Sequence, residues 1–464
     1  MLLCAMLAPL CACAAEDGFP GFTPLGDPNR MTDPRRWGEL NTHDPAILKE
    51  GDRYYVFSTD ASYGDLHKPG IQVRVSTDLI TWEYLGTAFA DFERDCAEVI
   101  AYAKLDPLKK QGLWAPDVVK VGEVYRMYFS ASTFGSSRSC IALAEAGRPE
   151  GPYVYRGIVV RSYANALNGA NAIDPSIATD AQGNQWMSYG SFFGGIFLQM
   201  LDAKTGMLPN PPAKPVRIAG SRGAAIEGSC IVYMPGNQYY YLFVSCGSLS
   251  SNYNIRVGRS REITGPYVDA SGRDLNSLGA GYDSTIGVKL IGGFTFLSDP
   301  GVPPTKGTMA PGHNDVLMDG GDYFLVHHAR TFKLPDYWFT MNVRRFFMNR
   351  FDWPVAAPNR YTGEKLEPAS IPDGAYGLVF HLDDTNEKSR DSVGVALHNG
   401  EITGAVTGSY RVYDQYHVAL LLDGEEYDGF VLKQYDWERK RDVTAFTAMS
   451  EKGQAVWGGT LMIE

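Results

Sequence analysis

Cysteine is scarce in this 464-residue chain. Seven cysteines are present, and three of them fall within the first 13 residues. The other four are Cys96, Cys140, Cys230 and Cys246. None of them forms a C-x-x-C pair, so a zinc site is not expected. Cys230 and Cys246 flank one predicted hairpin and are the candidates for a disulfide, but buried free thiols are the preferred interpretation.

The chain also lacks an excess of positive charge, helical periodicity and long apolar runs. Its formal net charge is -11, so a nucleic-acid partner is not expected. No long stretch repeats apolar residues at helical spacing, and no run after the N-terminal segment is long enough to span a bilayer. Aromatic residues at 12%, with 50 glycines and 27 prolines, favour strands and tight turns.

The first 15 residues are small and apolar, and no charge occurs before Glu16. This pattern predicts an export signal peptide over residues 1–15. The triplet at 12–14 fits a signal-peptidase site, whereas residues 10–13 resemble a bacterial lipobox, which would place a lipid anchor on Cys13. Both alternatives export the protein to a secreted, periplasmic or surface-bound location. Residues 16–40 are expected to form an ordered lead-in.

One phrase occurs five times in the chain, starting at His43, Ala115, Ile173, Ile226 and Gly312. Each copy has an acidic residue, an apolar strand, a turn and an aromatic-rich strand, which is typical of a β-hairpin. Five such units predict a five-bladed β-propeller over residues 41–355. The first strand of each blade lies beside the central axis. We therefore expect one shared register position to bring together Asp44, Asp117, Asp174, Glu227 and Asp315.

A proline-rich stretch between residues 354 and 372 marks a boundary after the predicted propeller. Beyond it, residues 372–464 alternate short β runs such as 376–380 and 418–422. We expect a small β-barrel or sandwich domain there, without an evident catalytic pattern. The predicted fold class is all-β throughout, and a monomer is the expected state.

Three of the five acidic residues suit catalysis. Asp44 and Asp174 each precede a proline, where a turn-forming aspartate is common, but Glu227 between apolar residues is poorly explained as a turn. Convergent carboxylates fit glycoside hydrolysis, in which one acid protonates the leaving oxygen and a second carboxylate attacks or activates water. We assign Glu227 as the acid, Asp44 as the base and Asp174 as the residue that tunes the pKa of the acid.

Histidines occur near the predicted axis in the fifth copy. One imidazole is too few ligands for zinc, so His313 either takes part in holding a hydrated hard cation or is satisfied by a backbone partner. His327 and His328 are expected on the outer side of their strand, as structural residues. The aromatic side chains next to axial strand ends either stack on sugar rings or pack in the core; they are Trp114, Phe192 and Phe193.

Several phrases in a fixed order carry a resemblance: NAIDPSI, YGSFFGGI, AAIEGSCIVY, YYYLFVS, NYNIRVGRSREITGPYVDASG and MAPGHNDV. Over residues 41–350 the chain resembles the endo-α-1,5-L-arabinanases of glycoside hydrolase family 43. Its tail after Pro372 is similar to the extra β domain of a two-domain subgroup. The resemblance implies an inverting hydrolase on a five-bladed propeller that cleaves internal α-1,5-linked L-arabinofuranosyl bonds in arabinan.

The resemblance also implies roles for single residues. Asp44 corresponds to the general base, Asp174 to the pKa modulator and Glu227 to the general acid, and His313 corresponds to a residue that helps to hold a hydrated calcium ion. The implied substrate-binding residues are Asn171, Ala172, Ile173, Ser191, Phe192 and Phe193. The family usually has Trp where this chain has Phe193, which keeps a stacking face but lacks the indole donor.

Other interpretations compete with endo action. Within the family, the alternative is an exo-acting α-L-arabinofuranosidase or β-xylosidase, and the products released from linear arabinan distinguish it. A non-catalytic glycan-binding propeller is disfavoured because all three carboxylates are retained. A sialidase-like propeller is disfavoured because residues 76–82 lack the glycine of an Asp-box and no arginine triad is evident.

Overall fold

The computed structural model describes residues 33–60, 70–106, 109, 111–162, 169–281, 285–301, 304–332, 339–385 and 389–462. The predicted signal peptide, Cys13 and most of the lead-in lie outside the described residues. Within them the regular secondary structure is nearly all strand, which confirms the predicted all-β class. No helix in the described ranges is long and apolar enough to cross a membrane.

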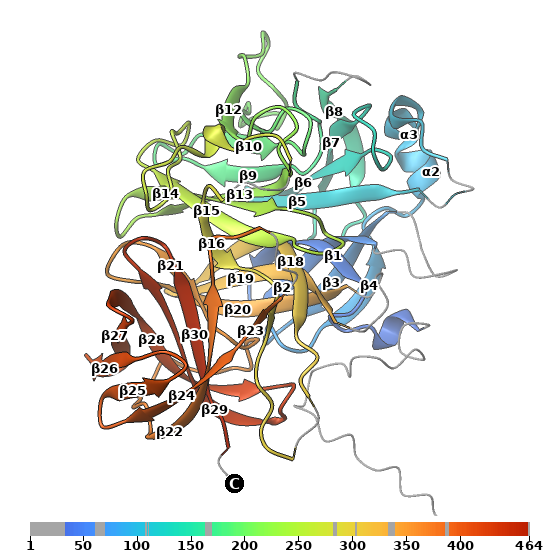
Figure 1. The fold of residues 1–464 in the computed structure, drawn as a ribbon. Coiled ribbons are helices and arrows are strands. Elements are labelled where there is room, and N and C mark those ends of the chain that lie inside the picture. The colour runs from blue at the N-terminus through green and yellow to red at the C-terminus, as the bar shows by residue number, and fades with distance from the viewer. Residues whose placement is uncertain are drawn as a thin grey trace, which may run out of the picture.

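Five antiparallel blades form the upper part of the molecule in Figure 1 and confirm the predicted propeller. Blades one and two comprise β1 (Thr42–Glu50), β2 (Arg53–Asp60), β3 (Ile71–Ser76), β4 (Glu83–Thr87), β5 (Leu113–Val121), β6 (Val124–Ala131), β7 (Cys140–Ala146) and β8 (Val154–Arg161). Blades three and four comprise β9 (Ser176–Thr179), β10 (Gln185–Tyr189), β11 (Ile196–Met200), β12 (Val216–Ala219), β13 (Ile226–Met234), β14 (Tyr239–Cys246), β15 (Asn254–Ser260) and β16 (Val288–Ile291). Blade five comprises β18 (Thr308–Asp319), β19 (Asp322–Thr331), β20 (Thr340–Met348) and β21 (Pro354–Ala356).

The innermost strands form a closed ring around the axis. Each inner strand contacts the next one: β1 contacts β5, β5 contacts β9, β9 contacts β13 and β13 contacts β18. The ring closes because β18 also contacts β1. The end of the lead-in strengthens this closure, because the N–H of Asn41 donates to the carbonyl of Phe339 and the N–H of Met341 donates to the carbonyl of Glu39, both at 2.9 Å. Glu39 also forms a buried ion pair with Arg360 at 3.4 Å. The first and last blades are thus joined by polar contacts that begin before β1.

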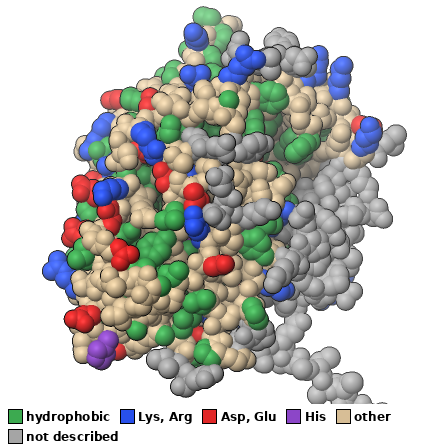
Figure 2. Space-filling model, in the orientation of Figure 1, with side chains coloured by type: hydrophobic (Ala, Val, Ile, Leu, Met, Phe, Trp, Pro, Cys, Tyr) green, Lys and Arg blue, Asp and Glu red, His purple; other side chains and the backbone are tan. Residues whose placement is uncertain are grey.

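Short helices are confined to connections: η1 (Pro34–Arg36), α2 (Phe92–Asp95), α3 (Ala97–Ala103) and η4 (Leu275–Ser277). Helices α2 and α3 pack against blade two, where Phe92 and Val99 enter a cluster with Phe129 of β6 and Ala142 of β7. The side of the molecule shown in Figure 2 carries acidic and basic side chains interspersed with apolar ones.

A bulge near the start of the inner strands sets the register of the repeat. In blades one, two, four and five the pairing skips two residues between the partners His43/Ala46, Trp114/Asp117, Glu227/Cys230 and Gly312/Asp315. The residue after the first partner has a left-handed backbone in these four blades, and Asp174 of blade three has the same conformation. These equivalent residues are Asp44 (φ 50°), Ala115 (38°), Asp174 (59°), Gly228 (57°) and His313 (47°).

This register corrects the prediction that all five acidic residues occupy one position. Asp44 and Asp174 are equivalent, but Glu227 stands one residue earlier in its blade. Asp117 and Asp315 stand two residues later. The aligned sequence phrases hid these offsets because a bulge changes which side chains face the axis without changing the strand–turn–strand pattern.

The predicted separate C-terminal β domain is a closed barrel, coloured orange to red in Figure 1. Its strands are β22 (Gly374–His381), β24 (Val393–His398), β25 (Glu401–Gly404), β26 (Gly408–Tyr413), β27 (His417–Leu422), β28 (Glu425–Asp436), β29 (Arg441–Ser450) and β30 (Ala455–Thr460). The short strand β23 (Arg390–Asp391) leaves the barrel and pairs in parallel with β17 (Phe294–Thr295) of the propeller. A single apolar cluster spans both domains and includes Phe347, Trp353, Phe430, Met449 and Trp457.

The four cysteines of the described chain are buried free thiols, as predicted. Cys230 and Cys246 do not form a disulfide. The Sγ of Cys230 instead contacts Oδ1 of Asp315 at 3.6 Å.

Candidate active site

A cleft of about 540 Å³ lies where the inner strands begin, and all five blades contribute to its lining. It collects the sequence-predicted residues Asp44, Trp114, Asn171, Ile173, Asp174, Ser191, Phe192, Phe193, Glu227 and His313. Ala172 is the exception, because its side chain is fully buried in an apolar cluster beside the cleft. The side chain of Ala172 therefore does not line the cleft, and its substrate-binding role stays a prediction.

Main-chain amides link each blade to its neighbour around the axis. The N–H groups of the left-handed residues Ala115, Asp174 and His313 donate to the hydroxyls of Thr59, Ser130 and Ser245, at 2.7, 2.9 and 2.7 Å. Two junctions use other acceptors: the N–H of Asp44 donates to Nδ1 of His328 (3.1 Å), and the N–H of Gly228 donates to Oδ2 of Asp174 (3.2 Å). These bonds satisfy buried amides that the bulges remove from the strand ladders.

Asp44 is held from several sides. Its Oδ2 accepts a hydrogen bond from the hydroxyl of Thr59 at 2.8 Å and lies 2.8 Å from Nδ1 of His43. Its Oδ1 lies 2.9 Å from Nδ1 of His313 and 3.6 Å from Nδ1 of His328. The rings of His43 and His328 stack with centroids 4.2 Å apart. Rotation of the carboxylate would break at least one of these contacts.

Charge and burial act in opposite directions on this group. Burial by itself would raise the pKa of Asp44, but the charges and hydrogen bonds of His313 and His43 outweigh it and hold the pKa well below 3.8. For His313, burial lowers the pKa, yet Asp44 and the two other carboxylates raise it to about 9. Asp44 is therefore an ionised carboxylate paired with an imidazolium, which suits a base that activates water.

Glu227 is held by two hydroxyl groups. Ser191 donates to its Oε2 at 2.7 Å, and Tyr253 donates to its Oε1 at 2.9 Å. Tyr253 is buried, and its ring lies against Gly312, where an added Cβ would come within 2.1 Å of two ring carbons. Both carboxyl oxygens of Glu227 thus have a fixed partner, and the group stays in the cleft wall.

The charges of both other carboxylates, Glu227 and Asp44, act on the pKa of Asp174. Burial is the main reason why its pKa rises to about 8, and the charges of Glu227 and Asp44 raise it further, against the opposing charge of His313. Its Oδ2 accepts the hydrogen bond from the amide that directly follows Glu227. The arrangement separates an ionised base from a pair of carboxyls, Asp174 and Glu227, that repel each other's second charge.

Aromatic side chains line the cleft. Trp114, Phe192 and Phe193 are each half-buried at its wall, and Phe339 lies beneath His43 with ring centroids 4.3 Å apart. Phe134, in the connection from β6 to β7, is 91% exposed and also lines the cleft. Exposed rings at a polar cleft offer stacking faces for sugar rings.

Asp117 and Asp315 do not reach the cleft. Oδ2 of Asp117 accepts from the N–H of Ile177, and Oδ2 of Asp315 accepts from the N–H of Ile47 at 2.8 Å. Each therefore connects its blade to the next one, outside the lining of the cleft that holds Asp44, Asp174 and Glu227. Burial, reinforced by the charge of Asp315, raises the pKa of Asp117 to about 8, and burial also raises the pKa of Asp315.

Few residues beside His313 could serve as ligands to a metal ion. Nδ1 of His313 is taken by Asp44, which leaves Nε2 for an ion. In the described part of the chain, the group of three possible ligands with donor atoms within 4.8 Å is His43, Asp44 and His328, and those atoms are already paired with one another. Calcium prefers six to eight oxygen ligands. The donor set thus fits a hydrated ion held through one imidazole nitrogen, and not a calcium ion enclosed by protein carboxylates.

Sequence reasoning missed several site residues. His328 was expected on the outer side of its strand, but it stacks on His43 and accepts the amide of Asp44, so that prediction is wrong. His327 beside it is a buried structural residue, as predicted, with Nδ1 2.9 Å from the carbonyl of His328. The double histidine in an inner hairpin and the tyrosine at the second position of NYNIRV were visible signals. The aromatic residue of STFGSS was a third.

Comparisons with known proteins identify the family of this chain. Residues 38–355 match the family described as "Glycosyl hydrolases family 43", and residues 358–458 match a "C-terminal lipocalin-like domain". The chain is 35% identical to "Extracellular endo-alpha-(1->5)-L-arabinanase" of Thermotoga petrophila, over 91% of this chain and 94% of the relative. It is 33% identical to "Extracellular endo-alpha-(1->5)-L-arabinanase 2" of Bacillus subtilis, over 90% and 93%.

Solved structures give the same result. The crystal structure of endo-1,5-alpha-L-arabinanase from Thermotoga petrophila superposes with a TM-score of 0.81 at 33% identity, covering 92% of this chain and 99% of that one. The Cellvibrio cellulosa alpha-L-arabinanase complexed with arabinohexaose matches with a TM-score of 0.55 at 30% identity, covering 68% and 95%. The chain therefore belongs to glycosyl hydrolase family 43.

Proposed function

We propose that this protein hydrolyses internal α-1,5-linked L-arabinofuranosyl bonds in arabinan, with inversion at the anomeric carbon. The observation that carries the proposal is the asymmetric support of its carboxylates in one cleft. Asp44 is paired with the His313 imidazolium, whereas Glu227 is held by two neutral hydroxyls beside Asp174. An ionised base and a proton donor in one cleft are the two groups that glycoside hydrolysis needs.

The roles follow from these environments. Asp44 is the base, and it removes a proton from a water molecule as that water attacks the anomeric carbon. Glu227 is the acid, and it gives its proton to the leaving glycosidic oxygen. Asp174 is the modulator: its Oδ2 accepts from the amide of Gly228, directly after Glu227, and its pKa of about 8 keeps a second negative charge away from the acid at neutral pH. His313 keeps Asp44 ionised and in place.

Endo action is supported by the relatives that match both domains. Two relatives named as endo-acting align over 90% or more of this chain, whereas "Extracellular exo-alpha-(1->5)-L-arabinofuranosidase ArbA" of Cellvibrio japonicus aligns over 63%. Linear arabinan should release mixed oligosaccharides in the first minutes of reaction. Arabinose alone at that stage would instead support the exo-acting alternative. Proton NMR of the first-formed anomer tests inversion independently.

The expected calcium ion is part of the proposal. A hydrated cation at Nε2 of His313 would add positive charge beside Asp44 and Asp174, and ligation requires that nitrogen to lose its proton. Treatment with a chelator should lower activity, and calcium should restore it more fully than magnesium, which demands a stricter geometry. Chelated enzyme with full activity, and no ion beside His313 in a crystal grown with calcium, would remove the metal from the proposal.

We also propose that the protein is exported. Two relatives that match most of the chain are named extracellular, and the sequence pattern of residues 1–15 predicts an export signal. Mass spectrometry of the mature protein distinguishes the two forms of processing, because a lipid on Cys13 adds a diacylglyceryl mass that signal-peptidase cleavage does not. A mature chain that retains residues 1–15 would contradict export through this segment.

A further inference from the structure

The hydroxyl of Tyr253 and the segment that follows β22 of the barrel are part of one connected set of contacts that ends at Glu227. We propose that Tyr253 is a positioning residue for the proton donor and that the barrel domain holds Tyr253 in place through Asn252. This inference rests on the proposed role of Glu227 as general acid. It gives the barrel domain a function in the reaction carried out in the propeller.

The first step concerns the carboxyl group itself. Because Ser191 and Tyr253 bind different oxygens of Glu227, the carboxyl group cannot rotate without losing one of the two bonds. A protonated carboxyl must present one particular oxygen to the glycosidic bond. Tyr253 is packed between Gly312 and His328, whose ring lies nearly parallel to it at 5.9 Å. Its hydroxyl thus has a fixed position from which to orient the acid.

The second step concerns the turn that carries Tyr253. This turn joins β14 to β15, and its residues Ser248, Leu249 and Ser250 line the cleft. Asn252 closes it, since Oδ1 of Asn252 accepts from the N–H of Ser248 at 2.9 Å and the N–H of Tyr253 donates to the carbonyl of Ser248 at 2.9 Å. The position of Tyr253 therefore depends on the side chain of its neighbour Asn252.

The third step crosses the domain boundary. Nδ2 of Asn252 donates to the main-chain carbonyl of Thr385, in the connection from β22 to β23 of the barrel. The same connection also binds Arg256 of β15. The guanidinium of Arg256 is fully buried and donates to Oδ1 of Asp383 at 2.7 Å and to the carbonyl of Asp384 at 3.0 Å. A buried charge left without these acceptors would be costly, so residues 383–385 are fixed on blade four.

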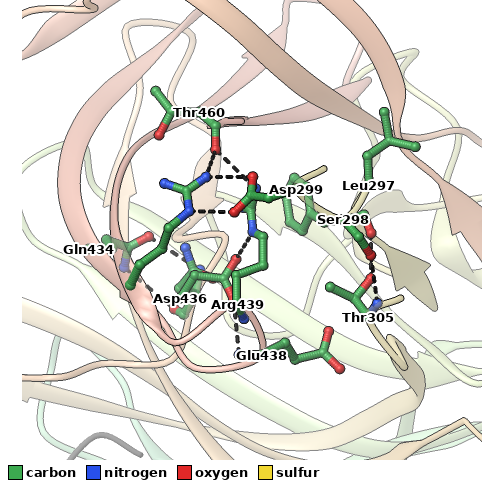
Figure 3. A network of polar contacts seen from close by, with 12 residues as sticks. Leu297, Ser298, Asp299, Thr305, Gln434, Asp436, Glu438, Arg439 and Thr460 are labelled. Carbon is green, nitrogen blue, oxygen red and sulfur yellow. Dashed lines mark hydrogen bonds and ion pairs between the residues drawn. The ribbon is translucent and has the colours of Figure 1, made fainter. Parts of the chain in front are cut away.

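The interface contains a second polar network that serves as an internal control. Figure 3 shows Asp299, from the connection before β18, beside Arg439 of the barrel. Oδ2 of Asp299 also accepts from Nε of Arg441 at 2.6 Å. This network joins the same two domains but makes no contact with the turn that carries Tyr253. A variant in this network therefore distinguishes loss of docking between the two domains from loss of the position of Tyr253.

The test uses the full-length enzyme and aryl arabino-oligosaccharides with leaving groups of graded acidity, together with linear arabinan. Tyr253→Phe should lower kcat on arabinan about tenfold, the upper end of the loss expected for one hydrogen bond between neutral groups, with KM unchanged. Substrates with acidic leaving groups should be spared, because they need less protonation. Asn252→Ala should show the same selective loss at about fivefold. Asp299→Asn should lower the melting temperature without any leaving-group dependence.

Several results would overturn the inference. Equal losses on all leaving groups for Tyr253→Phe would show that the hydroxyl does not position the acid. An Asn252→Ala enzyme that behaves like Asp299→Asn would show that the barrel contact only stabilises the fold. Glu227→Gln separates this failure from failure of the proposed function. If Glu227→Gln shows the leaving-group dependence and Tyr253→Phe does not, the positioning role alone is wrong; if neither shows it, the assigned acid is wrong.

Discussion

The main-chain N–H of Gly228 donates to Oδ2 of Asp174 at the junction of blades three and four. Three other junctions use a hydroxyl for this purpose, but blade three has Gly190 at the equivalent place. A Cβ on Gly190 would lie 2.2 Å from the carbonyl oxygen of Gly195, and its φ is 133°, so no serine or threonine fits. The carboxylate of Asp174 takes the place of the missing hydroxyl and is thereby fixed next to Glu227.

Asp174→Asn should preserve this geometry, since the amide oxygen still accepts from Gly228, and should prevent the side chain from ionising. The pKa of Asp174 is about 8 and asparagine cannot ionise, so the ionisation of Asp174 no longer contributes to the basic limb of the kcat/KM profile, and that limb should change position. Ser130→Ala is the matched control, because it removes a bond of the same ring without a charge and should leave the limb in place. An unmoved limb in Asp174→Asn would contradict the tuning role.

His43→Gln should affect the acidic limb of the kcat/KM profile. His43 is one of the two groups that hold the pKa of Asp44 well below 3.8 against the effect of burial. With His43 gone, the pKa of Asp44 rises, and a base that must be ionised then becomes active only at higher pH. The acidic limb of kcat/KM should therefore shift upward. Identical acidic limbs in variant and wild type would show that His313 and Thr59 suffice, and Thr59→Val provides the comparison for loss of a neutral partner.

The sequence predicted the propeller, the barrel and the convergence of Asp44, Asp174 and Glu227 in one cleft because repeat phrases, turn residues and a family resemblance are all local in the chain. It could not predict the axial offsets. Glu227 and Asp174 look equivalent in their phrases, yet the bulge places them one position apart. His328 was misplaced for a similar reason, since in a strand a shift of one residue exchanges the two faces. The contact of Asn252 with Thr385 joins segments 133 residues apart, and no pattern in either segment indicates it.

Asp117→Asn should flatten the pH dependence of stability. The pKa of Asp117 is about 8 in the folded protein against an ordinary value of 3.8. As pH rises above about 4, the unfolded chain loses this proton while the folded protein keeps it, so stability falls from about pH 4 to pH 8. Asparagine cannot ionise, so this fall in stability is lost. Its side-chain oxygen still accepts from the N–H of Ile177. Melting temperatures measured across this range should fall less steeply in the variant than in wild type, and the exposed Asp52→Asn should behave like wild type. Parallel curves for Asp117→Asn would contradict the prediction.

Phe134→Ala should weaken substrate binding without affecting the reaction. The ring is 91% exposed at the cleft and contributes little to the core, so the melting temperature should not change. Stacking of an aromatic ring is worth about 0.5–1.5 kcal/mol, which corresponds to a rise in KM for arabinan of about two- to tenfold. Because the ring makes no contact with Asp44 or Glu227, kcat should stay near the wild-type value. Leu85→Ala is the control, since Leu85 is also exposed but does not line the cleft. Short oligosaccharides that do not reach Phe134 should show no change in KM. A fall in kcat with KM unchanged would mean that Phe134 acts on the reacting groups and not as a surface for the sugar chain.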